Sequence, residues 1–197
     1  MLPDMFVDGP VRGRAALYPT FWLVPSQGAN DTGSFATLAN YFTTTDSFEI
    51  DAIVAGFNAA AIGDVYSAFV ATADGSHNIT GTVVSAQSRF TTTATGRQHA
   101  VFSIPRTILG AGASYLVGLV ITSGIGTTAC RALITSGSVG TFDVELPSQG
   151  VAMPPALITS TGRAWFTQNS DAPSSATKAS SAGGNNNYWV GLRVLSK

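Results

Sequence analysis

Charged side chains are scarce in this sequence. Only 11% of the 197 residues are Asp, Glu, Lys or Arg, against roughly 25% in a typical soluble domain. The 10 basic and 11 acidic residues give a net charge of −1. A protein that follows a nucleic-acid backbone needs several Lys or Arg side chains along one track of phosphates. We therefore expect no nucleic-acid partner.

Cysteine is almost absent as well. Cys130 is the only one, which excludes an internal disulfide and a zinc site of the Cys-x-x-Cys type. A lone cysteine is most often a small buried apolar residue, and we expect Cys130 to be one at the end of a strand.

Long hydrophobic runs are also missing. The longest, Tyr115–Ile121, is far shorter than the roughly 20 residues of a membrane-spanning helix. The first ten residues have neither a basic start nor an apolar run, so we expect no secretion signal. The sequence thus predicts no membrane span. If the protein reaches the cell exterior, it would do so without such a signal or as part of a larger particle.

Thr, Ser, Gly and Asn take the place of the missing charges, and they favour strands and tight turns. No stretch offers three turns of an amphipathic helix. Short β-branched and aromatic segments alternate instead with turn residues, as is typical of a sandwich or barrel. We predict strands at 18–24, 35–43, 47–57, 63–71, 79–89, 99–104, 116–121, 129–135, 140–146, 164–167 and 188–195.

Several of these segments carry finer predictions. Apolar residues at 48, 50, 52 and 54 alternate with acidic residues at 49 and 51, which predicts a half-buried strand. The continuous apolar run 116–121 predicts a central strand that is buried on both faces. Pro105 is expected to end the strand before it, and 169–187 to form a long polar loop.

The chain divides into two parts. Residues 1–30 are expected to form a short irregular N-terminal arm with the first strand, because proline and glycine interrupt any regular element there. Residues 31–197 are expected to form one all-β sandwich domain. The arm is a candidate docking segment, with Phe6, Arg12, Arg14 and Tyr18 as the residues that would contact a partner.

Four short sequence segments occur in the order in which a known family of domains has them. They are 48–53 (FEIDAI), 63–69 (GDVYSAF) followed by Asp74 and Gly75, 102–117 (FSIP to GAGASYLV) and 187–192 (NYWVGL). In these segments the chain resembles a jelly-roll module, a domain of unknown function that is found in bacterial surface proteins and phage virion proteins. The resemblance covers about 35–194. It departs at Gly191, where the family usually has an acidic residue, and residues 1–30 have no counterpart.

The resemblance implies an antiparallel jelly-roll-like β-sandwich with a structural or glycan-facing role and no catalysis. The residues agree on the last point. Glu49 and Asp51 could form a glycosidase pair, but an acidic pair on a solvated strand face is far more common. His77 and His99 lie beside no nucleophile motif and are expected to be solvated. We therefore predict that the protein is not an enzyme.

Calcium is the one metal with candidate ligands. Asp31, Asp46 and Asp64 could supply carboxylates to a structural ion between sandwich loops. The chain has no loop with the spacing of a dedicated calcium site. We therefore predict no metal site and no cofactor, with structural calcium as an open alternative.

Sugar binding needs aromatic faces together with short polar side chains. The sequence offers Trp165, Tyr188 and Trp189, with Asn186 and Asn187 beside the last two. These are the candidate glycan-binding residues. The alternative is that the aromatic side chains fill the core, which is the more common place for an aromatic residue in a strand.

Together these features predict a non-enzymatic structural protein of a phage virion, in a minor tail or tail-appendage position. It would be assembled in the host cytoplasm and exposed on the particle. Its expected partners are other virion proteins, further copies of itself in a homo-oligomer, with a trimer favoured, and a host surface glycan. A capsid decoration or head-fibre protein and a free carbohydrate-binding module are the alternatives.

Overall fold

The fold is described from a computed structural model of the chain. It describes residues 21–24, 35–124, 129–133, 143–145, 157–179 and 188–196, with the backbone alone for 21–24, 143–145, 159–161 and 196. Some predicted residues lie outside this part of the chain: the docking residues Phe6, Arg12, Arg14 and Tyr18, the calcium candidate Asp31, and the glycan candidates Asn186 and Asn187.

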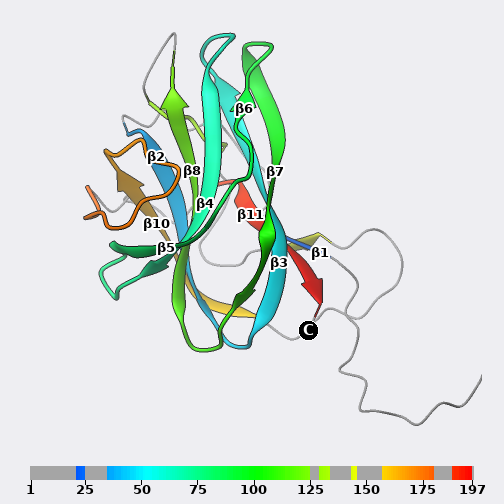
Figure 1. Cartoon of the computed structure of the whole chain (residues 1–197), viewed down its shortest axis with the longest axis vertical. Helices are drawn as coiled ribbons and strands as arrows, with labels where there is room; N and C mark the ends of the chain where they lie inside the picture. Colours follow the sequence, from blue (N-terminus) through cyan, green and yellow to red (C-terminus); the bar gives the residue numbers. More distant parts are fainter. Residues whose placement is uncertain are drawn as a thin grey trace, which may run out of the picture.

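Two antiparallel sheets pack face to face and form a sandwich (Figure 1). The first sheet has the strand order β7-β3-β11-β1-β9. The second has the order β10-β2-β8-β4-β5, with the short β6 paired to β4. The strands are β1 (Phe21–Val24), β2 (Thr37–Thr44), β3 (Phe48–Ala59), β4 (Val65–Ala73), β5 (Ile79–Ser85), β6 (Phe90–Thr91), β7 (Gly96–Leu109), β8 (Ser114–Ser123), β9 (Asp143–Glu145), β10 (Ile158–Phe166) and β11 (Val190–Ser196).

Eight of the strands follow the jelly-roll order. The chain passes back and forth between the sheets, so that β1, β11, β3 and β7 are neighbours in one and β2, β8, β4 and β5 in the other. This is the arrangement of two Greek keys in a double-sheet jelly roll. β9 and β10 extend the two sheets beside β1 and β2. The predicted all-β, jelly-roll-like sandwich is therefore confirmed.

The prediction of a central, doubly buried strand is also confirmed. β8 lies between β2 and β4, and its side chains from Tyr115 to Ile121 are all buried. Val117 and Leu119 face the core between the sheets, whereas Leu116 and Val120 belong to a second cluster on the outer face of the same sheet. Cys130 is fully buried in the inter-sheet core, as expected, but it lies outside the strands and not at the end of one.

The predicted alternation in β3 is right only for its first half. Phe48 and Ile50 face the core, but the next core residues are Ile53, Ala55 and Phe57, so the phase changes by one residue. Asp51 is the cause, because β11 pairs Val194 with Ile50 and Arg193 with Ala52 and leaves Asp51 without a partner in the ladder. Such a bulge is not visible in the pattern of residue types.

Pro105 does not end its strand, contrary to the prediction. β7 continues from Gly96 to Leu109. Its register with β3 passes from Ser103 opposite Ala52 to Thr107 opposite Ile50, so Pro105 lies within the irregular part of the ladder. β7 is also the end strand of its sheet. A proline is tolerated at an edge strand or bulge, where no ladder hydrogen bond is lost.

The beginning of the predicted polar loop is an ordered cover on the second sheet. Ala176 forms a two-way backbone bridge with Ile79, and Pro173 accepts a hydrogen bond from Thr82 Oγ1 at 2.7 Å. This segment, orange in Figure 1, lies beside β5 and β10. Beneath it lies an outer cluster of buried apolar residues: Ala39, Tyr41, Phe69, Ala71, Ile79, Leu116, Val120, Ala164 and Phe166.

A fully buried asparagine connects the two sheets. Asn40 lies in β2, and its Nδ2 donates hydrogen bonds to the carbonyl oxygens of Tyr188 at 2.7 Å and Val190 at 2.9 Å. Its Oδ1 accepts from the Tyr188 N–H at 2.9 Å. Both amide hydrogens and the amide oxygen are therefore used. This one side chain fixes the start of β11 against the opposite sheet.

The turn between β4 and β5 holds a half-buried histidine, not the solvated one expected. Asp74 Oδ1 accepts hydrogen bonds from the N–H groups of Ser76 and Asn78 at 2.8 and 2.9 Å. His77 has a left-handed φ of 66° and stacks on Tyr41 with ring centres 3.9 Å apart. Burial, and then the nearby Lys178, lower the pKa of His77, and Asp74 offsets this in part.

This turn is expected to weaken in acid. Because the pKa of His77 is lowered from 6.5 in the folded state, the unfolded chain takes up a proton first. The stabilisation is complete above pH 6.5 and falls as the pH drops from there toward the lowered pKa. His77→Asn should make the fall in melting temperature below pH 6.5 shallower, since asparagine tolerates a positive φ and does not titrate. The matched control is His99→Asn, on an exposed side chain, and equal effects of the two would contradict this assignment.

Candidate functional site

Two of the predicted sugar-binding aromatics lie together at the border of the core. Tyr188 is fully buried, and its hydroxyl accepts a hydrogen bond from Trp165 Nε1. The half-buried Trp165 stacks on Phe35 with ring centres 5.0 Å apart. The Arg163 guanidinium lies 5.2 Å from the centre of the Tyr188 ring. Tyr188 therefore has no free face to offer a sugar.

Trp189 lies apart from this pair, in the bend just before β11, and contacts a different set of residues. It covers Gly56, where a Cβ would approach Trp189 Cε3 to 2.8 Å and Leu133 Cδ1 to 2.9 Å. The His99 ring meets Trp189 edge-on at 4.9 Å. Trp189 is only partly buried. The three aromatics thus do not form one platform.

The carboxylates are similarly dispersed. Asp51 receives two hydrogen bonds from Arg193, Nε to Oδ1 at 2.5 Å and Nη2 to Oδ2 at 2.8 Å. Asp46 precedes the twelve-residue β3 and Asp64 follows it, so the two calcium candidates lie at opposite ends of that strand. The buried Asp64 accepts a hydrogen bond from Ala61 N–H at 3.0 Å. In the part of the chain that the structure describes, no three His, Cys, Asp or Glu residues form a group that could hold a metal.

Tyr66 is a titratable group with a strongly shifted pKa. It is buried against Phe57, with ring centres 4.3 Å apart, and its hydroxyl has no hydrogen-bond partner. Burial raises its pKa well above the usual range, and the nearby Cys130 and Asp64 add to the effect. The hydroxyl is therefore protonated at neutral pH, in keeping with a core residue.

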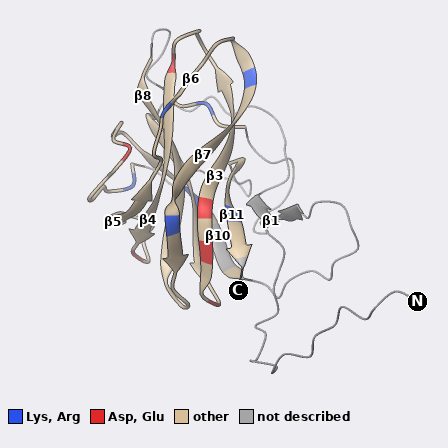
Figure 2. Cartoon of the chain, turned by 45° about the vertical axis from the view of Figure 1, so that its right-hand side comes forward, with Lys and Arg blue, Asp and Glu red and all other residues tan. Residues whose placement is uncertain are grey.

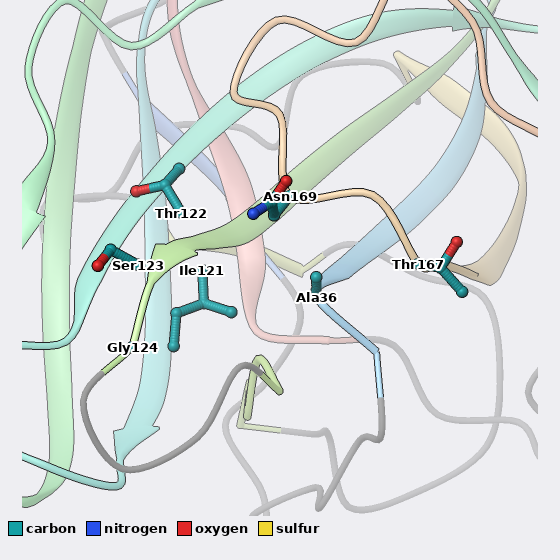
Figure 3. Close-up of a pocket in the computed structure, with 7 residues that line it drawn as sticks. All are labelled: Ala36, Ile121, Thr122, Ser123, Gly124, Thr167 and Asn169. Atoms are coloured by element: carbon teal, nitrogen blue, oxygen red, sulfur yellow. The ribbon is translucent and has the colours of Figure 1, made fainter.

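A small pocket lies where β8 ends, beside β2 and the segment after β10 (Figure 3). Its volume is about 300 Å³. Figure 3 shows Asn169 above β8, on the same side of the strand as Thr122. The pocket is lined by Ala36, Ile121, Thr122, Ser123, Gly124, Thr167 and Asn169. None of these side chains is charged. The sequence analysis did not find this site, because its residues come from three distant segments and form no motif.

A second surface lies along β7, the end strand of the first sheet. Val101 is 57% exposed and Ile108 is 71% exposed, both large apolar side chains on the outer side. We call this surface the β7 edge and define it by Arg97, His99, Val101 and Ile108. Arg97 and His99 are exposed as well.

No described strand pairs with the outer side of β7. Gly56 lies opposite His99 in the ladder. Its N–H donates to the Trp189 carbonyl and its carbonyl accepts from the Leu133 N–H, so Gly56 and His99 form a pair without backbone hydrogen bonds between them. The N–H and C=O of His99, and of Arg97 and Val101 in the same phase, therefore point away from β3. Among the described residues, one backbone hydrogen bond is made on this outer side of β7: the N–H of Gln87 donates to the carbonyl oxygen of Ser103 at 2.9 Å.

Comparisons with protein-family models, with curated proteins and with solved structures find no match for this chain. Within the described residues, no helix is long and apolar enough to cross a membrane.

Proposed function

We propose that this chain is a non-enzymatic structural protein of a phage virion, in a minor tail or tail-appendage position. It would be assembled in the host cytoplasm, exposed on the particle, and in contact there with other virion proteins and a host glycan. The jelly-roll sandwich supports this by analogy, since the same architecture recurs in viral capsid and lectin domains. The family resemblance of the sequence points the same way.

The observation that carries the proposal is the β7 edge. An end strand with free N–H and C=O groups is a template for a strand from another chain. Charged residues are few along the strands (Figure 2), so contact over this surface would bury few charges that need partners. A second copy of this chain is the occupant that we propose, within a homo-oligomer for which a trimer is the expected state.

Val101→Lys should separate the copies. A lysine at an edge strand opposes strand addition, because its charge would have to be buried at the contact. We expect the dissociation constant of the oligomer to rise about ten-fold or more, equivalent to about 1.4 kcal/mol. Sedimentation velocity of the full chain over a range of concentrations measures this directly.

Ile62→Lys is the matched control. Ile62 is 60% exposed, close to the value for Val101, and lies in the turn between β3 and β4, outside the strand β7. The control should keep the sedimentation of the unmodified chain. An unmodified chain that is monomeric at every concentration, or a Val101→Lys variant that associates as before, would contradict assembly through this edge.

The pocket at the end of β8 favours a second candidate, a free carbohydrate-binding module. A capsid decoration or head-fibre protein is the other alternative and would use the β7 edge in the same way. A free carbohydrate-binding module would not be incorporated into a particle, which distinguishes it from the proposed virion protein. A capsid decoration or head-fibre protein would be found on the capsid and not on the tail.

A further inference from the structure

The pocket at the end of β8 has the chemistry of a site for a neutral, hydroxylated ligand. Ala36 and Ile121 give it an apolar part, and Thr122, Ser123, Thr167 and Asn169 give it hydroxyl and amide groups. Thr122 Oγ1 donates to Val65 O at 3.2 Å, which leaves its oxygen able to accept. An amide supplies both donors and an acceptor. An ionic ligand would find no charged partner in this lining.

Two unpartnered polar groups beside the pocket strengthen this assignment. Gln168 lies between the lining residues Thr167 and Asn169, and its buried Nε2 has no hydrogen-bond partner. Ser67 Oγ is also buried and unpartnered. Buried polar atoms without partners are uncommon and costly. Both atoms belong to residues near the pocket, and each would gain a partner from a hydrogen-bonding group that reached it.

The sheet register places these two groups in the same region. Ser67 pairs with Val120, and Val120 pairs with Thr37 on the other side of β8. Thr37 Oγ1 in turn donates to the backbone carbonyl of Gln168 at 2.8 Å. Ser67 and the backbone carbonyl of Gln168 therefore both lie near Val120, two residues from Thr122, and neither Ser67 nor Gln168 lines the pocket itself.

We infer that this pocket binds one neutral sugar residue of a glycan. Its volume of about 300 Å³ is at the lower limit of the roughly 300–1,000 Å³ found for small-molecule sites, which suits a single ring. The hydroxyl and amide side chains would exchange hydrogen bonds with the sugar hydroxyls, and the Ala36 methyl group would contact its C–H groups. The inference rests on the glycan contact of the proposed function and moves it away from Trp165, Tyr188 and Trp189. Among the described residues no aromatic side chain lines the pocket, so hydrogen bonds, and not stacking on an aromatic face, would hold the sugar ring.

The test is a titration of the full chain with the methyl glycosides of glucose, galactose, mannose and N-acetylglucosamine, followed by ¹H–¹⁵N NMR. At least one should shift the side-chain amide signals of Gln168 and Asn169 and the backbone signals of 121–124. Asn169→Ala should weaken that binding about five-fold or more, the effect of one or two lost hydrogen bonds. Thr122→Val should weaken it in the same direction.

Thr93→Val is the matched control for the loss of a hydroxyl, because Thr93 is exposed and lies outside the pocket. It should leave binding unchanged. If both Asn169→Ala and Thr122→Val still bind the glycoside, and the shifted signals lie elsewhere on the chain, the assignment of the sugar to this pocket is wrong. The proposed glycan contact would then remain, at another site. No shift with any glycoside at tens of millimolar concentration, together with no binding to a glycan array, would overturn both. Neither result bears on assembly, which the sedimentation of Val101→Lys measures separately.

Discussion

Asn40→Leu should lower the free energy of unfolding by about 3 kcal/mol, since each buried polar group left without a partner costs roughly 1–3 kcal/mol. Leucine has a similar size and no hydrogen-bonding atoms. The Tyr188 N–H would lose its bond to Oδ1, and the Val190 carbonyl would lose its bond to Nδ2. Both backbone groups belong to the region where β11 meets β2. The midpoint of unfolding in urea, with an unchanged slope, measures the loss.

Asn58→Ala provides the control for this experiment. Asn58 lies in β3 and is only partly buried. Among the described residues, its backbone N–H donates to the Arg131 carbonyl and its side chain has no hydrogen-bond partner. Its replacement should change the stability by less than about 0.5 kcal/mol. Equal effects of the two substitutions would contradict the role assigned to the Asn40 bridge between the sheets.

Gly118→Ala should destabilise the fold by about 2–3 kcal/mol, the upper range for an added methyl group in a packed core. A Cβ at Gly118 would lie 2.5 Å from Phe69 Cζ and 2.8 Å from its Cε1. Phe69 is fully buried in the outer cluster beneath the ordered loop segment 169–179, so the ring has little room to move. Thermal and urea unfolding of the purified variant would give the size of the loss.

A double-mutant cycle isolates this contact. In a Phe69→Leu background, the smaller side chain makes room for the methyl group, and the cost of Gly118→Ala should fall to about 1 kcal/mol or less. If Gly118→Ala costs the same in both backgrounds, the clash with Phe69 is not the reason for glycine at this position.

Much of the fold could be predicted from the sequence, because burial leaves a direct trace in residue type. The doubly buried β8 follows from an unbroken apolar run. Bulges leave no such trace. The sequence shows Asp51 as one more member of an alternating pattern, yet its bulge reverses the faces of Ile53 and Phe57. Pro105 breaks the rule for strands only because β7 is an end strand, and that position is set by the tertiary arrangement.

The candidate sites were harder to predict. Trp165 and Tyr188 were found from their residue types, but the same types suit a core, and Tyr188 is buried there. Asn40 carries no signal of its bridging role, since its partners are backbone groups about 150 residues further along the chain. The pocket joins 36, 121–124, 167 and 169. Only the crossing of the strands brings these segments together.

The most direct measurement for the proposed function is electron microscopy of the parent phage particles labelled with an antibody against this chain. A structural component should be labelled at one fixed position on every particle, and the tail is the position that we expect. Label on the capsid would replace the tail assignment with decoration or a head fibre. Particles without label, from a culture in which the chain is found free in solution, would contradict the claim that it is a virion protein.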